Sequence, residues 1–291
     1  MKITLTGSLG NISKPLAQTL ISAGHQVTII SSSADKVKAI EELGATAAIG
    51  SVDDIGFLTK AFTGADAIYA MCPPSYTTND YRAYISGTGS NYAAAIKASG
   101  VKRVVNLSSI GAHLTDGTGP IKGLHDVEQL FNKLEDVSVK HMRPAYFYFN
   151  FYGNTDMIKH AGIIGANYSE SATLVMVHPK DIALAIAEEI QQPFTGKSVR
   201  YVTSDVRTTA EVATALGTAV GKPELKWIEF TDEQALGGMI DAGLSQEVAK
   251  NYVEMGTAIR SGVLWEDFNQ NKPAFSPIKL EDFAKEFAGN F

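Results

Sequence analysis

Two glycines, Gly7 and Gly10, stand between a short apolar run and a helical pattern at the start of the chain. The first lets the chain turn sharply, and the second leaves backbone amides open to an approaching anion. A pyrophosphate would lie there at the positive N-terminus of the helix expected over residues 12–23. The spacing predicts a dinucleotide-binding turn, in which Ser13 replaces the usual third glycine. A purely structural helix cap fits the same two glycines.

Small hydroxyl side chains follow the second apolar run, at Ser31, Ser32 and Ser33, and Lys36 comes shortly after them. In a dinucleotide-binding unit this loop contacts the adenosine ribose. A carboxylate at its start would bond the free 2′-hydroxyl of NAD, whereas hydroxyls and an ammonium suit the 2′-phosphate of NADP. The loop therefore favours NADP, and Asp35 keeps NAD as an alternative. Serines that only cap the next helix are the structural interpretation.

Polar and aromatic residues further along the chain are candidate contacts to the two ends of such a ligand. Asp53 or Asp54 is placed to reach the adenine amino group, and a cap of the next helix fits them equally well. Ser108 follows a buried strand pattern and is placed to bond a nicotinamide or a carbonyl oxygen, or simply to close the strand. Tyr146, Phe149 and Asn150 lie in a dense aromatic segment. Such rings form a wall for a quinone-like acceptor, or a core between domains.

Strand patterns and helical patterns alternate through the first half of the chain. The expected strands cover residues 3–6, 25–30, 45–50, 67–71, 101–107 and 137–142, and the expected helices cover residues 12–23, 34–43, 55–62, 80–98 and 124–133. This alternation predicts an α/β fold with a doubly wound parallel sheet, the Rossmann fold. Its ligand crevice lies beyond the carboxyl ends of the strands, where Gly7, Ser31, Met71 and Ser108 fall.

The second half of the chain has a more broken pattern. The expected strands cover residues 198–203 and 226–230, and the expected helices cover residues 181–191, 210–220, 232–242 and 246–261. We expect residues 1–150 to form the dinucleotide-binding domain. Residues 151–291 should form mainly a smaller α+β substrate lobe, with some segments returning to the Rossmann core.

The composition is that of a globular chain with an acidic balance. Its 291 residues are 45% hydrophobic, enough for one large domain or two modest ones. A formal net charge of −6 without a basic stripe argues against a nucleic-acid partner. Cys72 is the only cysteine and the histidines show no paired spacing, so a reducing cytoplasm and no metal site are expected. No membrane partner is expected. The expected partner is a small-molecule substrate, and a homo-oligomer stays open.

Six motifs, taken in order, resemble those of the NmrA-like branch of the atypical short-chain dehydrogenases/reductases. They read TGSLGNIS, GSVDD, YAMCPP, VVNLSSIGA, HMRPAYFYFN and VHPKDIA. The resemblance spans roughly the whole chain, and the chain is similar in particular to NAD(P)H:quinone oxidoreductases. It implies further cofactor contacts at Leu9, Asn11, Ile12, Met71, Cys72 and Pro73. The first three belong to the phosphate-binding turn, and the other three flank the ribose and nicotinamide.

The tyrosine and lysine pair of conventional short-chain dehydrogenases is absent, because none of the 11 tyrosines has a lysine four residues later. In the resembling family the corresponding helix often carries Lys or His followed three residues later by Glu, and His125 with Glu128 matches this pattern. The resemblance makes His125 a candidate substrate-orienting or proton-donating group. A histidine merely held by Glu128 is the structural interpretation.

The expected function is therefore hydride transfer from NAD(P)H to a quinone-like or other conjugated acceptor. A non-catalytic redox sensor that binds NADP is the alternative, and the missing tyrosine and lysine pair favours it. An isomerase or epimerase would also need the absent tyrosine.

Overall fold

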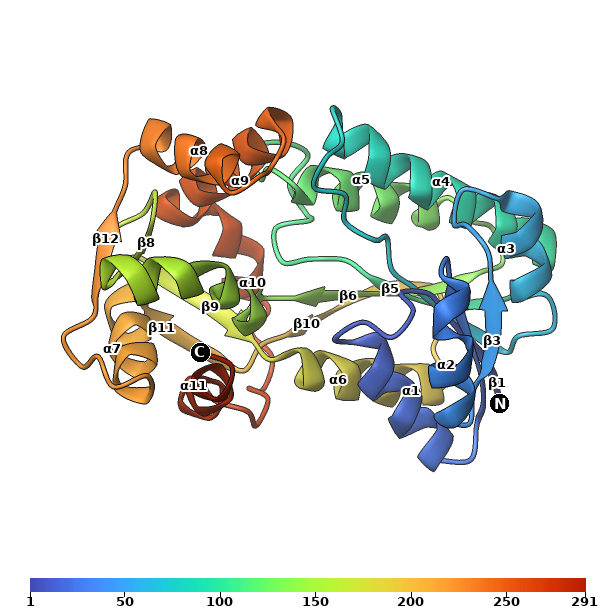
Figure 1. Ribbon diagram of the computed structural model, residues 1–291. Helices are drawn as coiled ribbons and strands as arrows, with labels where there is room; N and C mark the ends of the chain where they lie inside the picture. The colour runs from blue at the N-terminus through green and yellow to red at the C-terminus, as the bar shows by residue number, and fades with distance from the viewer.

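Seven parallel strands form the central sheet of the computed structural model, which describes residues 1–291 (Figure 1). In sheet order they are β10 (Lys197–Val202), β6 (Ser138–Pro144), β5 (Arg103–Leu107), β4 (Ala67–Ala70), β1 (Lys2–Leu5), β2 (Gln26–Ser31) and β3 (Thr46–Ile49). The chain moves outward from β1 to β2 and β3 and then returns to β4 on the other side of β1. Such a reversal opens a crevice at the carboxyl ends of the strands. The predicted doubly wound fold is confirmed.

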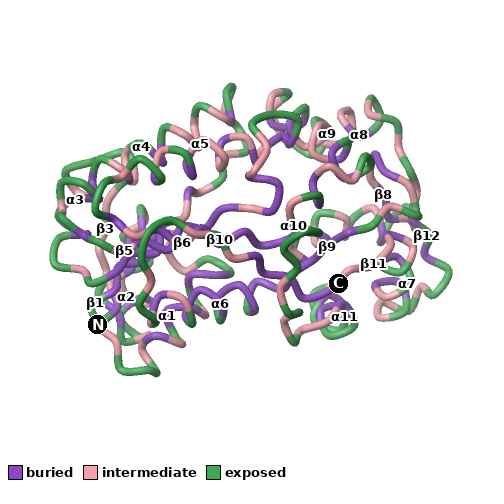
Figure 2. The backbone as a smooth tube through the Cα atoms, turned by 180° about the vertical axis from the view of Figure 1, so that it is seen from behind, coloured by how far each residue is buried: buried purple, intermediate pink, exposed green.

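Helices cover both faces of this sheet (Figure 1). One face carries α1 (Ser13–Ser22) and α6 (Pro179–Gln191), the other carries α3 (Ile55–Phe62), α4 (Tyr81–Ser99) and α5 (Ile121–Asn132), and α2 (Val37–Glu42) lies beside β3. Figure 2 shows that α6, which returns from the second half of the chain together with β10, is largely buried. No helix combines the length and the apolar character needed to cross a membrane.

The remaining elements form the smaller lobe, at the left of Figure 1. Its three-stranded sheet has the order β11 (Asp205–Thr208), β9 (Thr173–Val177) and β7 (Tyr146–Phe147), and a two-stranded sheet pairs β12 (Lys226–Glu229) with β8 (Ile163–Ala166). Its helices are α7 (Thr209–Ala219), α8 (Asp232–Asp241), α9 (Gln246–Ser261), α10 (Glu266–Gln270) and α11 (Leu280–Gly289). One continuous apolar core joins this lobe to the α1 and α6 face of the central sheet.

Some element predictions hold to the residue and others fail. α3 and α9 have the predicted bounds. The helix expected over residues 34–43 is divided into a 3₁₀ turn, Ala34–Lys36, and α2. α5 begins three residues earlier than expected, directly after Pro120, whose fixed φ suits the start of a helix. The strands β7, β8, β9 and β11 and the helices α10 and α11 were not predicted, because their patterns are short and their partners lie far away in the sequence.

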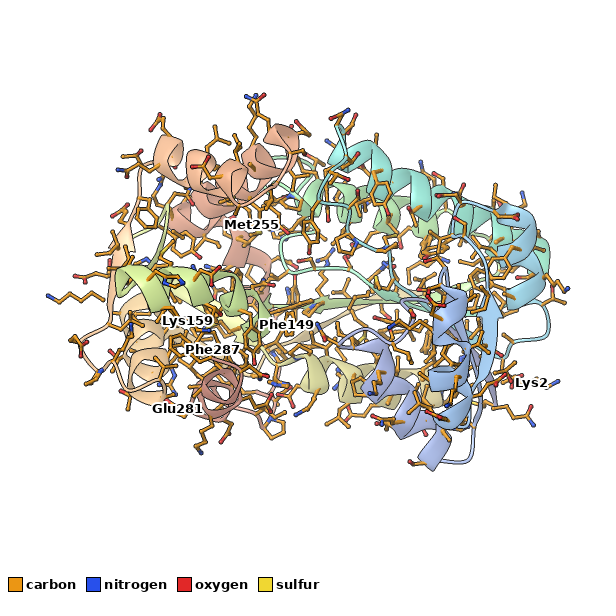
Figure 3. The ribbon with its side chains drawn as sticks, in the orientation of Figure 1. Lys2, Phe149, Lys159, Met255, Glu281 and Phe287 are labelled. Carbon is orange, nitrogen blue, oxygen red and sulfur yellow. The ribbon has the colours of Figure 1, made fainter.

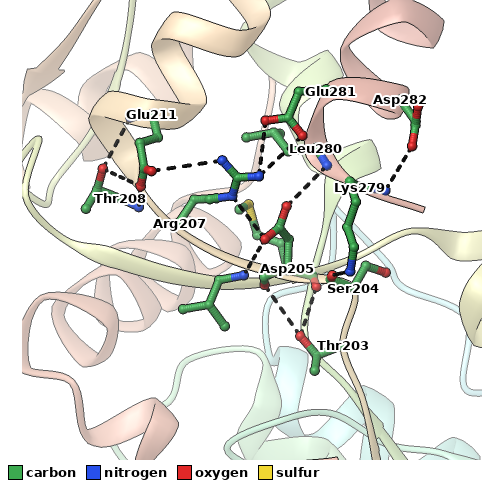
Figure 4. Close-up of polar contacts among 12 residues, drawn as sticks. Thr203, Ser204, Asp205, Arg207, Thr208, Glu211, Lys279, Leu280, Glu281 and Asp282 are labelled. Carbon is green, nitrogen blue, oxygen red and sulfur yellow. Dashed lines mark hydrogen bonds and ion pairs between the residues drawn. The ribbon is translucent and has the colours of Figure 1, made fainter. Parts of the chain in front are cut away.

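A polar cluster holds the start of α11 against the start of α7 (Figure 4). The Arg207 guanidinium pairs with Asp205 (Nε–Oδ1 3.0 Å) and with Glu281 of α11 (Nη2–Oε1 3.1 Å). Thr208 and Glu211 form a capping box at the N-terminus of α7. The cluster therefore ties the C-terminal helix to the rest of the smaller lobe.

A buried ion pair joins the central sheet to the helix that covers it. Arg143 of β6 donates to Glu128 of α5 through Nε (2.9 Å to Oε1) and Nη2 (2.6 Å to Oε2). Its Nη1 also donates to the hydroxyl of Tyr201 on β10 and to Asp267 of α10, each at 3.1 Å. Burial alone would lower the pKa of Arg143, but the bonds and charge of Glu128 raise it above its ordinary value. The network thus links the sheet, α5 and the smaller lobe.

Removing the cation from this pair should destabilise the fold. Arg143→Met leaves Glu128 buried without a counter-ion, so we expect the free energy of unfolding to fall by about 3–5 kcal/mol. Urea denaturation measures this change. The double variant Arg143→Met with Glu128→Gln should lose less, because no buried charge stays alone. Lys38→Met breaks the exposed pair with Glu42 and is the matched control, with an expected change below about 1 kcal/mol. An equally small loss in Arg143→Met would contradict this account.

Candidate cofactor and acceptor site

The turn between β1 and α1 requires glycine at position 7. Gly7 has a φ of +90°, a conformation that residues with a side chain rarely adopt. A Cβ atom there would lie 2.5 Å from Ser13 Oγ and 2.6 Å from Met71 Cε. The Gly10 amide donates to the Gly7 carbonyl (3.1 Å), and a Cβ atom at Gly10 would lie 3.1 Å from the same oxygen. The turn has no room for a side chain at Gly7, whereas at Gly10, which is exposed, a Cβ atom would press only on this oxygen.

Four backbone amides of this turn, those of Leu9, Asn11, Ile12 and Ser13, have no acceptor within the protein. No side chain caps α1, and its first turn holds no acidic residue. Free amides at a helix N-terminus attract anions because the helix dipole adds to their partial positive charge. The arrangement fits a pyrophosphate group. Ile12 could contribute only its backbone, because its side chain is buried in the core.

Ser13 takes the place of the third glycine without disturbing the turn. Its side chain is buried, and its hydroxyl donates to the carbonyl of Thr6 at 3.0 Å. This bond joins the first turn of α1 to the end of β1. A serine therefore supports the close packing that a glycine usually allows at this position.

Four candidate residues lie at the end of β2 and directly after it. One of them is hydrogen-bonded within the protein through its side chain, and the side chains of the other three are not. Ser31 is buried, and its hydroxyl bonds Ser8 and the backbone of Ser33. The side chains of Ser32, Ser33 and Lys36 make no hydrogen bond or ion pair within the protein, and those of Ser32 and Lys36 are exposed. Two hydroxyls and an ammonium are therefore available to a ligand.

The loop after β3 offers an exposed carboxylate, and the loop after β4 offers half-buried and buried groups. Asp54, not Asp53, caps α3 by accepting from the Phe57 amide (3.0 Å), so Asp53 stays exposed with a bond only to Ser51. After β4, Met71 and Pro73 are half-buried. Cys72 is buried, and burial raises the pKa of its thiol to about 12, which keeps it protonated and unreactive.

Ser108 is held by the buried ion pair. Only 3% of it is exposed, and its hydroxyl donates to Glu128 Oε1 at 2.5 Å. A hydroxyl has one proton, and an ionised carboxylate can only accept. Ser108 therefore has lone pairs to offer a ligand but no second proton, so it is suited to accept a hydrogen bond rather than to donate one to a carbonyl oxygen.

His125 does not pair with Glu128, contrary to the sequence interpretation. The Glu128 carboxylate is occupied by Arg143 and Ser108. The Nδ1 of His125 instead lies 2.9 Å from the carbonyl of Ala112, which can only accept, so Nδ1 carries a proton. The second nitrogen, Nε2, is then a base in the neutral ring and a donor in the protonated ring.

The aromatic segment after β6 is divided between core and surface. Tyr148 is fully buried and stacks on Phe283 of α11, with ring centroids 5.3 Å apart. Phe149 is 44% exposed, Asn150 is exposed, and Tyr146 is half-buried. Figure 3 shows Phe149 near the middle of the molecule, between the central sheet and the smaller lobe. Phe149 and Asn150 are thus the most accessible members of the segment, whereas Tyr146 is no more accessible than Phe147 and Tyr152.

Sequence analysis missed a grouping of tyrosines around this segment. Burial raises the pKa of Tyr252 of α9 above its ordinary value, and neighbouring phenols raise it further. These phenols belong to Tyr81 of α4, Tyr76 of the preceding loop, and Tyr146 of β7. Four elements contribute, and no spacing in the sequence links them. The smaller lobe also holds this loop directly, since the Ser245 amide donates to the Tyr76 carbonyl (3.2 Å).

Structures with the same fold include two bacterial reductases. The triphenylmethane reductase of Citrobacter sp. complexed with NADP(H) is 21% identical, with a TM-score of 0.82 over 99% of this chain and 100% of the other. The NADPH-dependent quinone oxidoreductase QOR2 of Escherichia coli is 18% identical, with a TM-score of 0.81 over 98% of each chain. No curated protein matches this sequence. Residues 1–279 match the NmrA-like family. With its two-glycine turn and doubly wound sheet, the chain belongs to the NmrA-like family.

Proposed function

We propose that this chain is an NADPH-dependent oxidoreductase that transfers hydride to a quinone-like or other conjugated small molecule. The observation that carries the proposal is the set of four amides without a protein acceptor at the N-terminus of α1. A dinucleotide pyrophosphate suits these amides in charge and in the close approach that Gly10 permits. The two bacterial reductases support the cofactor class, since one is described with NADP(H) and the other as NADPH-dependent.

The loop after β2 supports NADP over NAD. Ser32, Ser33 and Lys36 offer two hydroxyls and an ammonium without partners in the protein. Charge-assisted hydrogen bonds to a phosphate are stronger than hydrogen bonds between neutral groups. These residues would therefore bind the 2′-phosphate of NADP more strongly than the free 2′-hydroxyl of NAD. Asp35 is also exposed in this loop and keeps NAD as the alternative.

The residues at the reacting end suit an acceptor that needs little acid or base help. When bound, NADPH would supply the hydride. Tyr146 and Phe149 would flank a flat conjugated acceptor, and Asn150 would donate a hydrogen bond to it. The protonated ring of His125 would donate from Nε2 to the oxygen that becomes negative. Ser108 would accept a hydrogen bond from the nicotinamide amide, since its hydroxyl already donates to Glu128.

A non-catalytic sensor that binds NADP is the second candidate. The observation that favours it is the engagement of Ser108 by Glu128, together with the absence of a tyrosine and lysine pair. Such a protein would bind the cofactor and oxidise it negligibly with any acceptor. The tests below therefore measure binding and turnover separately.

Blocking the glycine turn should abolish cofactor binding. A leucine at Gly10 would place its side chain against the Gly7 carbonyl and over the free amides, so we expect Gly10→Leu to weaken NADPH by more than about 10²-fold in calorimetry. Gly87→Leu, on the exposed face of α4 with no atom near its Cβ, is the control. NADPH oxidation with quinones and triphenylmethane dyes, measured on the unmodified chain, distinguishes enzyme from sensor. If that chain binds neither NADPH nor NADH, the proposal is wrong.

Replacing His125 should slow the acceptor step alone. We expect His125→Ala to reduce quinone turnover on the order of 10²-fold, because a positioned proton donor is lost, while the Kd for NADPH stays the same. Stopped-flow measurement of NADPH oxidation gives the rate, and calorimetry gives the Kd. His160→Ala, an exposed histidine in the smaller lobe, is the matched control. Turnover that is unchanged in His125→Ala would exclude this histidine from the reaction.

A further inference from the structure

Ser8 has an unusual backbone conformation within the phosphate-binding turn. Its φ is +53°, and it is one of two residues other than glycine with a positive φ in the chain. This conformation is unfavourable for a residue with a side chain, and its neighbour Gly7 avoids the cost. A glycine would therefore be the natural choice at position 8 if only the backbone mattered. The contacts of the side chain must therefore account for a serine at this position.

The Ser8 side chain joins the turn to the end of β2. Its hydroxyl donates to Ser31 Oγ at 2.9 Å, and its amide donates to the Ile30 carbonyl at 3.1 Å. Ser31 Oγ in turn donates to the Ser33 carbonyl (3.4 Å) and accepts from the Ser33 amide (3.3 Å). Ser31 is 3% exposed, so these bonds are protected from water. A chain of hydrogen bonds thus runs from the Ser8 hydroxyl through Ser31 Oγ to the backbone of Ser33.

This chain of hydrogen bonds lies between two sets of protein groups, each of which would bind an anionic part of the ligand. On one side are the free amides at the start of α1. On the other are Ser32, Ser33 and Lys36, whose side chains have no partner in the protein. A ligand with two anionic groups at a fixed separation binds well only if both receiving sites are held at that separation. The Ser8–Ser31 bond is the side-chain bond that joins the two loops.

We propose that Ser8 is a specificity-determining positioning residue. Its bond to Ser31 holds the loop at residues 31–36 at the distance from the pyrophosphate turn that the 2′-phosphate of NADP requires. The inference rests on the proposed function, since it presumes that a dinucleotide binds here. It assigns to Ser31 a supporting role beneath the loop instead of a direct bond to the phosphate.

Binding of NADPH and NADH to three single variants tests this role. We expect Ser8→Ala, Ser8→Gly and Ser31→Ala each to lower the ratio of NADPH to NADH affinity by about three- to tenfold, the range of one hydrogen bond, with NADH itself changed by less than about twofold. The double variant Ser8→Ala with Ser31→Ala should lose no more than Ser31→Ala alone, because Ser31→Ala already removes the bond between the two side chains. Lys36→Glu should also lower the ratio, and Lys38→Glu, two residues along, is its matched control.

The two substitutions at Ser8 separate positioning from folding. Ser8→Gly relieves the left-handed backbone while removing the hydroxyl, so it should melt at the same temperature as the unmodified chain or higher and still lose selectivity. An unchanged affinity ratio in Ser8→Gly would overturn the inference, as would an equal weakening of both cofactors. An unmodified chain with a ratio near one would overturn the inference alone. An unmodified chain that binds neither cofactor would overturn the proposed function as well.

Discussion

The tight turn at Gly7 is the constraint on which the candidate site depends. β1 lies in the middle of the sheet between β2 and β4, so its carboxyl end opens on the crevice. The chain must pass from this strand into α1 within a few residues, and a left-handed backbone at Gly7 makes the turn short enough. The short turn leaves amides without internal acceptors at the start of a helix. The geometry of the turn itself therefore leaves free amides that suit an anion.

A second constraint fixes the side chains around the carboxyl ends of β5 and β6. The Glu128–Arg143 pair is buried, so both charges must be satisfied by partners that stay in place. Its carboxylate accepts a hydrogen bond from Ser108, and its guanidinium donates to Tyr201 and Asp267. Structural demands therefore occupy groups that sequence analysis had considered for chemistry. His125, bonded only through Nδ1, keeps a nitrogen available.

The alternation of strands and helices was predictable because each buried element carries its own periodic pattern, as in α3 and α9. Elements whose burial depends on distant partners were less predictable. β9 lies between β7 and β11, and α11 packs against α7. The apolar residues of β9 and α11 are therefore buried only by partners from other parts of the chain. The partner of Glu128 was missed for a similar reason. A neighbour three residues away on one helix was visible in the sequence, whereas Arg143, on another element, was not.

By itself, the sequence determined the parallel sheet, the glycine turn that precedes α1, and the resemblance to the NmrA-like family, because local periodicity and glycine spacing are properties of neighbouring residues. Only the tertiary structure decided which hydroxyls are free. Ser31 ends one strand and Ser108 directly follows another, yet each is bonded to a residue from another segment, while Ser32 and Ser33 keep their side chains free. A hydrogen bond needs two groups within about 3 Å of each other, and folding alone brings distant segments that close.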